Sequence, residues 1–267
     1  MTVPVLSRRS LGLATLGLFA AACGTSSTNA ALAPPPQAGA HWGYDGEDGP
    51  DHWADLDHDY SLCGTGHVQS PIDLPAAAHG AGQDIVIDYA EPLAAAKITH
   101  NGHTLQIAAP AGNANRIVVG GKVYDLQQFH FHTPSEHTLD GATTSMELHL
   151  VHRNAQGRLA VLAVLLAEAD QHSPYRRILF GGPAEAGGTK TVAGPVDLNS
   201  FLPTDFGQYQ YTGSLTTPPC SEGVAWTVLR TRMPVGADEA AYFRALFPHN
   251  SRPVHPVNGR AIVPTEH

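Results

Sequence analysis

The sequence is poor in positive charge. Its 267 residues include 15 Lys and Arg against 24 Asp and Glu, which gives a formal net charge of −9. Nucleic acid binding depends on Lys and Arg that neutralise phosphates, and no cluster of these residues is present. The composition therefore excludes nucleic acid as an expected partner.

Long apolar runs are also lacking. The run over residues 11–22 has about twelve residues, whereas a helix needs about 20 to cross a bilayer. It follows Ser7-Arg8-Arg9-Ser10-Leu11, which is a twin-arginine pattern. We therefore predict an export signal over residues 1–23, and we expect the protein to be periplasmic or associated with the cell envelope.

Cysteine is scarce, with three residues in the chain. Cys23 follows small residues and resembles a lipoprotein cleavage site, although Ala20 stands where leucine is usual. Two alternatives stay open: a lipid on Cys23 that tethers the protein to a membrane, or simple cleavage near the small residues that follow. The other two, Cys63 and Cys220, form an even pair in an exported chain, with two independent buried thiols as the alternative to a disulfide.

The remaining chain divides into two parts. Residues 24–40 are mostly Ser, Thr, Ala, Pro and Gln, which predicts a flexible or polyproline tether with nothing to bury. Residues 41–267 are expected to form the folded domain. The whole chain contains 27 Gly and 21 Pro, which indicates a turn-rich and mostly β protein. No internal repeat is visible.

Two segments illustrate the expected elements. Residues 158–166 are almost continuously apolar, which is typical of a strand buried on both faces, although a helix of similar length has the same pattern. Residues 237–247 space their aromatic and leucine side chains for a helix with one buried face. Asn101-Gly102 and Gly120-Gly121 are expected turns between strands.

Two further segments, residues 126–133 and 145–154, alternate with a period of two and are predicted strands. Successive side chains of a strand point to opposite faces. Gln128, His130 and His132 therefore share one face of the first strand. On the second strand, the shared face carries Glu147, His149 and Val151.

Three of these side chains are imidazoles that can converge on one ion. Paired strands lie roughly 5 Å apart and alternate residues about 6.6 Å apart, so His130, His132 and His149 can each reach a zinc ion at about 2.0–2.1 Å. Three protein ligands leave a fourth position open, as in catalytic zinc sites. Gln128 and Glu147 each precede a ligand by two residues, where a hydrogen-bond partner of the ring is expected. The alternative is two amphipathic strands whose histidines face water.

Together with motifs elsewhere, these strands make the chain resemble an α-class carbonic anhydrase of the secreted bacterial kind. The motifs lie between residues 41 and 260 in the family's order, so the resemblance covers essentially the whole mature domain. They are His41-Trp-Gly-Tyr44, Gln69-Ser-Pro-Ile-Asp73, Gln128-Phe-His-Phe-His132, Ser135-Glu-His137, Glu147-Leu-His-Leu-Val-His152, Gly213-Ser-Leu-Thr-Thr-Pro-Pro-Cys-Ser-Glu-Gly223 and Asn258-Gly-Arg260.

The resemblance implies a fold and an activity. The expected fold is mostly β (α+β), a single domain built on a large, twisted, mainly antiparallel central β-sheet with short surface helices. The expected activity is the zinc-dependent, reversible hydration of carbon dioxide to bicarbonate and a proton by a zinc-bound hydroxide. Relatives include dimers, so a homodimer stays open.

The resemblance also assigns roles to residues outside the ligand set. Thr216 and Glu136 would orient the hydroxide, Thr217 would contact bicarbonate, and His103 would be the proton shuttle. Backbone support for His132 is expected from Asn258. The remaining assignments are a cavity wall of Tyr44, Val151, Val161, Leu215 and Trp226, and a disulfide between Cys63 and Cys220.

The same residues allow two alternatives to an enzymatic function. A non-catalytic module with a carbonic anhydrase-like fold would lack a ligand histidine, but all three are present. An exported zinc-binding protein would keep the ligands and would not need the pair formed by Thr216 and Glu136.

Overall fold

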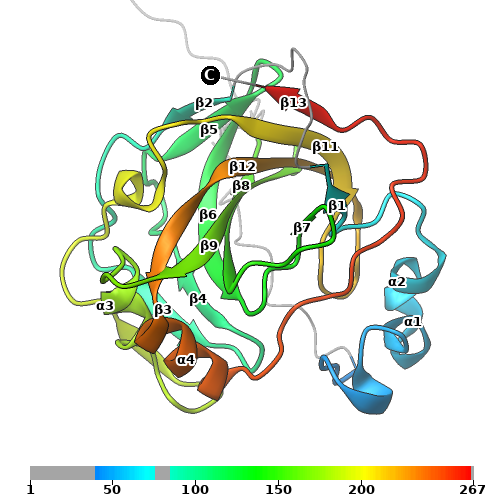
Figure 1. Cartoon of the computed structure of the whole chain (residues 1–267), viewed down its shortest axis with the longest axis horizontal. Helices are drawn as coiled ribbons and strands as arrows, with labels where there is room; N and C mark the ends of the chain where they lie inside the picture. Colours follow the sequence, from blue (N-terminus) through cyan, green and yellow to red (C-terminus); the bar gives the residue numbers. More distant parts are fainter. Residues whose placement is uncertain (1–39, 76–84, 266–267) are drawn as a thin grey trace, which may run out of the picture. The chain divides into compact units, whose positions relative to one another are not determined.

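The computed structural model describes residues 40–75 and 85–265 (Figure 1). The predicted export signal over residues 1–23, Cys23 and nearly all of the predicted tether over residues 24–40 lie outside the described residues. Among the described residues, no helix combines the length and apolar character needed to cross a membrane.

An 11-stranded sheet forms the body of the described domain (Figure 1). Nine of its strands follow one another in space as β10 (Thr189–Thr191), β3 (Lys97–His100), β4 (Leu105–Ala108), β6 (Lys122–His132), β8 (Met146–Arg153), β9 (Leu159–Ala169), β12 (Glu222–Gly236), β11 (Gln208–Ser214) and β13 (Val263–Thr265). The other two, β5 (Arg116–Val119) and β2 (Val86–Asp88), continue from β6.

The expectation of a mainly antiparallel sheet is confirmed, with one parallel pair near its centre. That pair joins β9 to β12, with Val161 opposite Trp226. A separate two-stranded parallel sheet pairs β1 (Asp73–Leu74) with β7 (Thr138–Leu139). The sheet is therefore mixed.

Both faces of the central strands are buried, which explains the continuous apolar sequence of β9. Leu162, Val164 and Leu166 belong to the larger hydrophobic cluster on one face. Val161, Ala163 and Leu165 belong to a second cluster on the other face. Each fully buried aliphatic side chain contributes roughly 1.5–3 kcal/mol, so a strand buried on both sides is strongly held. The prediction of a strand here is confirmed over the helical alternative.

The predicted turns position two hairpins. Gly120 and Gly121, both with positive φ, form the two-residue connection between β5 and β6. The connection between β3 and β4 has four residues, and its first residue, Asn101, accepts hydrogen bonds from the backbone N–H groups of His103 and Thr104 at 2.9 Å. This turn presents His103 at a fixed place beside the sheet.

The helices are short. They are η1 (Gly46–Asp48), α1 (Trp53–Leu56), η2 (His58–Tyr60), α2 (Leu62–Thr65), α3 (Arg176–Leu179), η3 (Leu198–Phe201) and α4 (Ala237–Leu246). The helix predicted over residues 237–247 is confirmed. Within residues 171–180 only α3 is helical, and the glycine-rich segment 181–194 contributes the edge strand β10, which pairs with β3.

A disulfide fastens the first helices to the loop after β11. Cys63 and Cys220 are bonded, with their Cα atoms 5.0 Å apart and 157 positions apart in the chain. Trp53 is fully buried beside this bond, and Trp42 and Tyr44 pack against the same cluster. The predicted disulfide is confirmed. Closing a loop of this length stabilises the folded state by about 5 kcal/mol in the chain-entropy model.

Candidate active site

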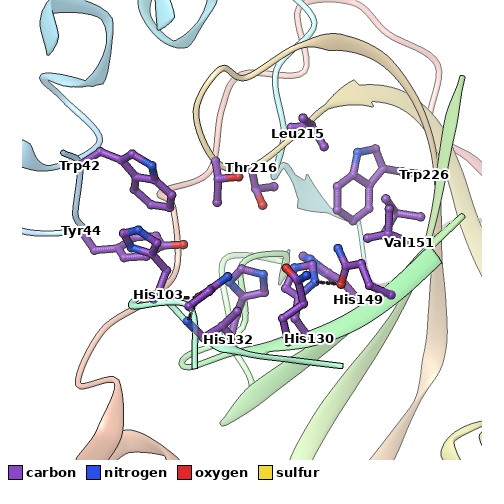
Figure 2. A pocket seen from close by; sticks show the side chains of 16 residues that line it. Trp42, Tyr44, His103, His130, His132, His149, Val151, Leu215, Thr216 and Trp226 are labelled. Atoms are coloured by element: carbon purple, nitrogen blue, oxygen red, sulfur yellow. Dashed lines mark hydrogen bonds between the residues drawn. The ribbon is translucent and has the colours of Figure 1, made fainter. Parts of the chain in front are cut away.

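Strands β6 and β8 bring the three predicted ligand histidines together. His130 lies directly opposite His149, and His132 lies opposite Glu147. The register is set by the other face, where Phe129 and Leu150 enter the main core. One nitrogen from each of the three imidazoles lies within 4.8 Å of the others, at the floor of a cavity (Figure 2).

Each imidazole is held by an oxygen acceptor at its other nitrogen. The Nδ1 atom of His130 lies 2.8 Å from Gln128 Oε1, and the Nε2 atom of His149 lies 2.8 Å from Glu147 Oε1. The Nδ1 atom of His132 lies 2.7 Å from a backbone carbonyl oxygen. Because these oxygens accept, the ring nitrogens bonded to them carry the hydrogens. The lone pairs are therefore on His130 Nε2, His132 Nε2 and His149 Nδ1.

These nitrogens fit a zinc ion. Burial lowers the pKa of His132 to about 4, and burial also places the pKa values of His130 and His149 below their ordinary value. All three rings are thus neutral near pH 7, which is the form that binds metal. His132 Nε2 is buried and has no hydrogen-bond partner within the described residues. Three neutral imidazoles at this spacing match the donor set of a catalytic zinc site.

The prediction that Asn258 supports His132 is wrong. The acceptor of His132 Nδ1 is the carbonyl oxygen of Asn250, whereas the Asn258 side chain donates to His67 O at 2.9 Å near the surface. Asn250 is held against the end of β6, where its side chain accepts from the Thr133 N–H at 2.7 Å and donates to the Phe131 carbonyl at 3.0 Å. Sequence reasoning missed Asn250 because a backbone carbonyl is common to every residue type.

Glu147 is a fully buried carboxylate with four donors. Besides His149, it accepts from His137 Nδ1 at 2.7 Å and from the backbone N–H groups of Glu136 and His137 at 2.8 Å. Burial alone would raise its pKa, but the two imidazoles keep the pKa of Glu147 well below its usual value. His137 stood within a motif of the family resemblance without an assigned role, and the structure shows its contact with Glu147.

Glu136 is buried next to the site rather than lining the cavity. Its Oε1 accepts from the backbone N–H of Arg252 at 2.9 Å. Its Oε2 has no partner of ordinary hydrogen-bond geometry within the described residues. Burial raises the pKa of Glu136 to about 7, opposed by His149 and by the hydroxyl of Thr216. The predicted pair of Glu136 and Thr216 is therefore brought together, and Arg252 was missed as its backbone support.

The cavity above the imidazoles has a volume of about 140 Å³. All the predicted wall residues line it, namely Tyr44, Val151, Val161, Leu215 and Trp226, and Thr216 and Thr217 line it as well. Figure 2 shows Val151 and Trp226 on one side of the imidazoles, with Trp42, Tyr44 and His103 on the other. The cavity therefore has one apolar side and one side that carries a titratable ring.

His103 lies on this second side and stacks on Trp42. The ring centroids are 3.6 Å apart and the planes differ by 6°. Burial, with smaller contributions from His41 and His100, lowers the pKa of His103 to about 4. The ring is therefore neutral near pH 7 in this position. Trp42 had no role assigned from the sequence beyond its place in the His41-Trp-Gly-Tyr44 motif, and it lines the cavity.

Comparison with known proteins agrees with this arrangement. A family model described as eukaryotic-type carbonic anhydrase matches residues 48–266. A carbonic anhydrase of Klebsiella pneumoniae is 38% identical over 226 residues, which cover 84% of this chain and 91% of that protein. A carbonic anhydrase of a Nostoc strain is 38% identical over 259 residues, covering 95% of this chain and 94% of that protein.

A solved structure is similar over the same region. The α-carbonic anhydrase of Thermovibrio ammonificans, in complex with the inhibitor sulfanilamide, is 37% identical with a TM-score of 0.78. The match covers 84% of this chain and 99% of that one. The fold is a mixed β-sheet, and the site is a cavity with three histidines at its floor. Together they define an enzyme. The chain belongs to the eukaryotic-type, or α-class, carbonic anhydrase family.

Proposed function

We propose that the protein catalyses the reversible hydration of carbon dioxide with one zinc ion held by His130, His132 and His149. The supporting observation is that three imidazole lone pairs face one cavity while the other nitrogen of each ring is tied to an oxygen acceptor. When bound, zinc would lower the pKa of a water ligand to about 7, as is established for carbonic anhydrases, and so make hydroxide available at neutral pH.

Thr216 and Glu136 would orient the attacking oxygen. An ionised carboxylate can only accept hydrogen bonds, so a Thr216 hydroxyl that donates to Glu136 must accept from the cavity side. The unpartnered Oε2 of Glu136 is the candidate acceptor. A positive charge at the three imidazoles would favour the ionised form of this carboxyl. The attacking oxygen would then present a lone pair to the substrate.

The apolar side of the cavity suits carbon dioxide, which is small and has no net dipole. Val151, Val161 and Trp226 are at most 9% exposed, and Leu215 packs beside them. These side chains offer no hydrogen bonds to hold water, so an apolar substrate can displace solvent there. The charged product, bicarbonate, would instead be contacted by Thr217. It would leave the cavity because the apolar wall offers it no hydrogen bonds.

His103 would carry the proton between the cavity and the buffer. Burial lowers the pKa of the stacked ring to about 4, which disfavours proton uptake from a donor of pKa about 7, so the shuttle would use a more exposed ring position with a pKa nearer the ordinary 6.5. His103 is half-buried and lines the same cavity as the three imidazoles, which supports this role.

We further propose that the protein acts outside the cytoplasm. The twin-arginine pattern and the apolar run over residues 11–22 support export. The bond between Cys63 and Cys220 supports it independently, because structural disulfides persist mainly in oxidising compartments.

A stopped-flow assay of carbon dioxide hydration, run with a determination of bound zinc, tests the proposal. We expect about one zinc ion per chain and an activity that is lost with a strong chelator and restored by added zinc. Bound zinc without hydration would instead indicate an exported zinc-binding protein. A chain with neither zinc nor activity would indicate a non-catalytic module.

A further inference from the structure

A line of buried hydrogen bonds leads from Glu147 away from the cavity. His137 donates or accepts at both ring nitrogens: Nδ1 lies 2.7 Å from Glu147 Oε1, and Nε2 lies 2.7 Å from the hydroxyl of Tyr211. That hydroxyl lies 2.8 Å from Ser70 Oγ, which accepts from the Ser214 N–H at 3.1 Å. All these side chains are at most 5% exposed.

The hydrogens along this line can be assigned from its two ends. The Glu147 oxygens already accept from two backbone N–H groups and from His149, so this carboxylate is the acceptor and His137 Nδ1 carries the hydrogen. In the neutral ring, Nε2 is then an acceptor, and Tyr211 donates its hydroxyl hydrogen to it. The Tyr211 oxygen in turn accepts from Ser70. Each member therefore fixes the orientation of the next one.

The end of the line is an atom shared with a zinc ligand. Glu147 Oε1 accepts from both His137 and His149. If His137 changed its tautomer, its Nδ1 would stop donating and the carboxylate would lose one of its four donors. The carboxylate could then rotate, and His149 would lose the partner that sets its ring orientation.

From this geometry we infer that Tyr211 and His137 are positioning residues for zinc, acting on His149 through Glu147. The inference rests on the proposed zinc site. Oxygen partners of metal-binding histidines typically influence metal affinity by 10- to 100-fold. Tyr211 is one step further from the ion, so an effect near the lower end of this range is expected.

Simple core packing is the competing role for these two residues. Tyr211 stacks on Trp226 with planes 11° apart, and His137 packs edge-on against the same ring at 5.0 Å. A packing role would change the stability of the protein without changing how long it retains zinc. The two roles therefore separate in the rate of zinc release.

Tyr211→Phe is the informative variant because it keeps the ring and removes one oxygen. Tyr209→Phe is a matched control on the same strand: Tyr209 is 1% exposed, belongs to the same hydrophobic cluster and donates to the Pro75 carbonyl at 2.6 Å, outside the line. Tyr211→Phe loses the hydrogen bonds to His137 and Ser70, whereas Tyr209→Phe loses the hydrogen bond to the Pro75 carbonyl. The variants therefore differ in whether the line that ends at Glu147 is affected.

The experiment measures the rate of zinc release to a chelator and the thermal stability of the metal-free protein. We expect Tyr211→Phe to release zinc about tenfold faster than wild type, and Tyr209→Phe to release it at the wild-type rate. Equal rates in all three proteins, or equal acceleration in both variants, would overturn the inference. If wild type retains no zinc at all, the proposed function fails instead.

A second pair of variants protects the test against a general loss of structure. His137→Phe removes the donor to Glu147, whereas His137→Asn keeps an N–H group near the position of Nδ1. We expect slower zinc release from His137→Asn than from His137→Phe. Equal release from both would show that the hydrogen bond does not position the carboxylate.

Discussion

The floor and the rim of the cavity hold their histidines in different ways. On the floor, His130, His132 and His149 each have one nitrogen bound to an acceptor at 2.7–2.8 Å. On the rim, His103 is held by stacking on Trp42, and its ring makes no hydrogen bond to the described residues. Such a stack contributes about 0.5–1.5 kcal/mol but binds neither ring nitrogen. The comparison sets hydrogen-bonded rings, at the place proposed for the metal, against a stacked ring at the place proposed for proton transfer.

Removing a floor histidine should have the largest effect. His130→Ala leaves two ligands and an open cavity, so we expect loss of bound zinc and a fall of carbon dioxide hydration to background. Zinc analysis and stopped-flow assay measure both. His58→Ala is the control, since the His58 side chain is fully exposed. Wild-type activity in His130→Ala would refute the ligand assignment.

Removing the rim histidine should slow the reaction while zinc stays bound. General acid–base groups typically contribute 10²–10⁴-fold, so His103→Ala is expected to lower turnover in dilute buffer by roughly 10²-fold. Added imidazole should restore part of the rate by carrying the proton itself. The check is a titration of turnover against buffer concentration. A variant that loses zinc, or that imidazole does not rescue, would remove the distinction between rim and floor.

The disulfide acts on the cavity wall between these two regions. The N–H of Cys220 donates to the carbonyl of Thr217 at 2.9 Å, so the bond to Cys63 anchors the loop that carries Thr216. Replacing both cysteines by Ser should lower the free energy of unfolding by up to about 5 kcal/mol. Urea denaturation of the variant and of reduced wild type measures this loss, and the two should agree. A loss below about 1 kcal/mol would mean that the closed loop adds little.

Removing the Trp42 ring that stacks on His103 should have the smallest effect. Burial is the main cause of the low pKa of His103, so Trp42→Ala, which exposes the ring, should raise this pKa from about 4 toward the ordinary value near 6.5. Titration of the His103 ring by NMR measures the shift. Tyr44→Phe is the control because Tyr44 meets His103 edge-on at 6.4 Å rather than in a stack. An unchanged pKa in Trp42→Ala would show that the stack does not shield the ring.

The histidines of the floor could be predicted from the pattern of the sequence, whereas most residues around them could not. Alternation along β6 and β8 placed Gln128, His130 and His149 on one face, because a strand's period of two relates sequence directly to side-chain direction. The cavity wall and the disulfide required the family resemblance. No local pattern links residues as far apart as Val161 and Leu215, or Cys63 and Cys220.

The remaining site residues depend on tertiary contacts. Asn250 acts through its carbonyl and Arg252 through its N–H, and neither group differs from one residue type to another. His137 stood within a predicted motif, but its role depends on meeting Glu147, which lies 10 positions away. The parallel pairing of β9 with β12 also had no signal, since an apolar run favours a central strand without giving its direction.

Asn250 has a consequence for how the protein is made. Its carbonyl holds His132, and its side chain donates to the backbone carbonyl of His103, so one late residue fastens both floor and rim. All three proposed zinc ligands leave the ribosome about a hundred residues earlier. In a nascent chain the three imidazoles are therefore present well before Asn250, which holds His132, has been synthesised. Tight metal loading is expected only once synthesis has passed this segment and it has docked.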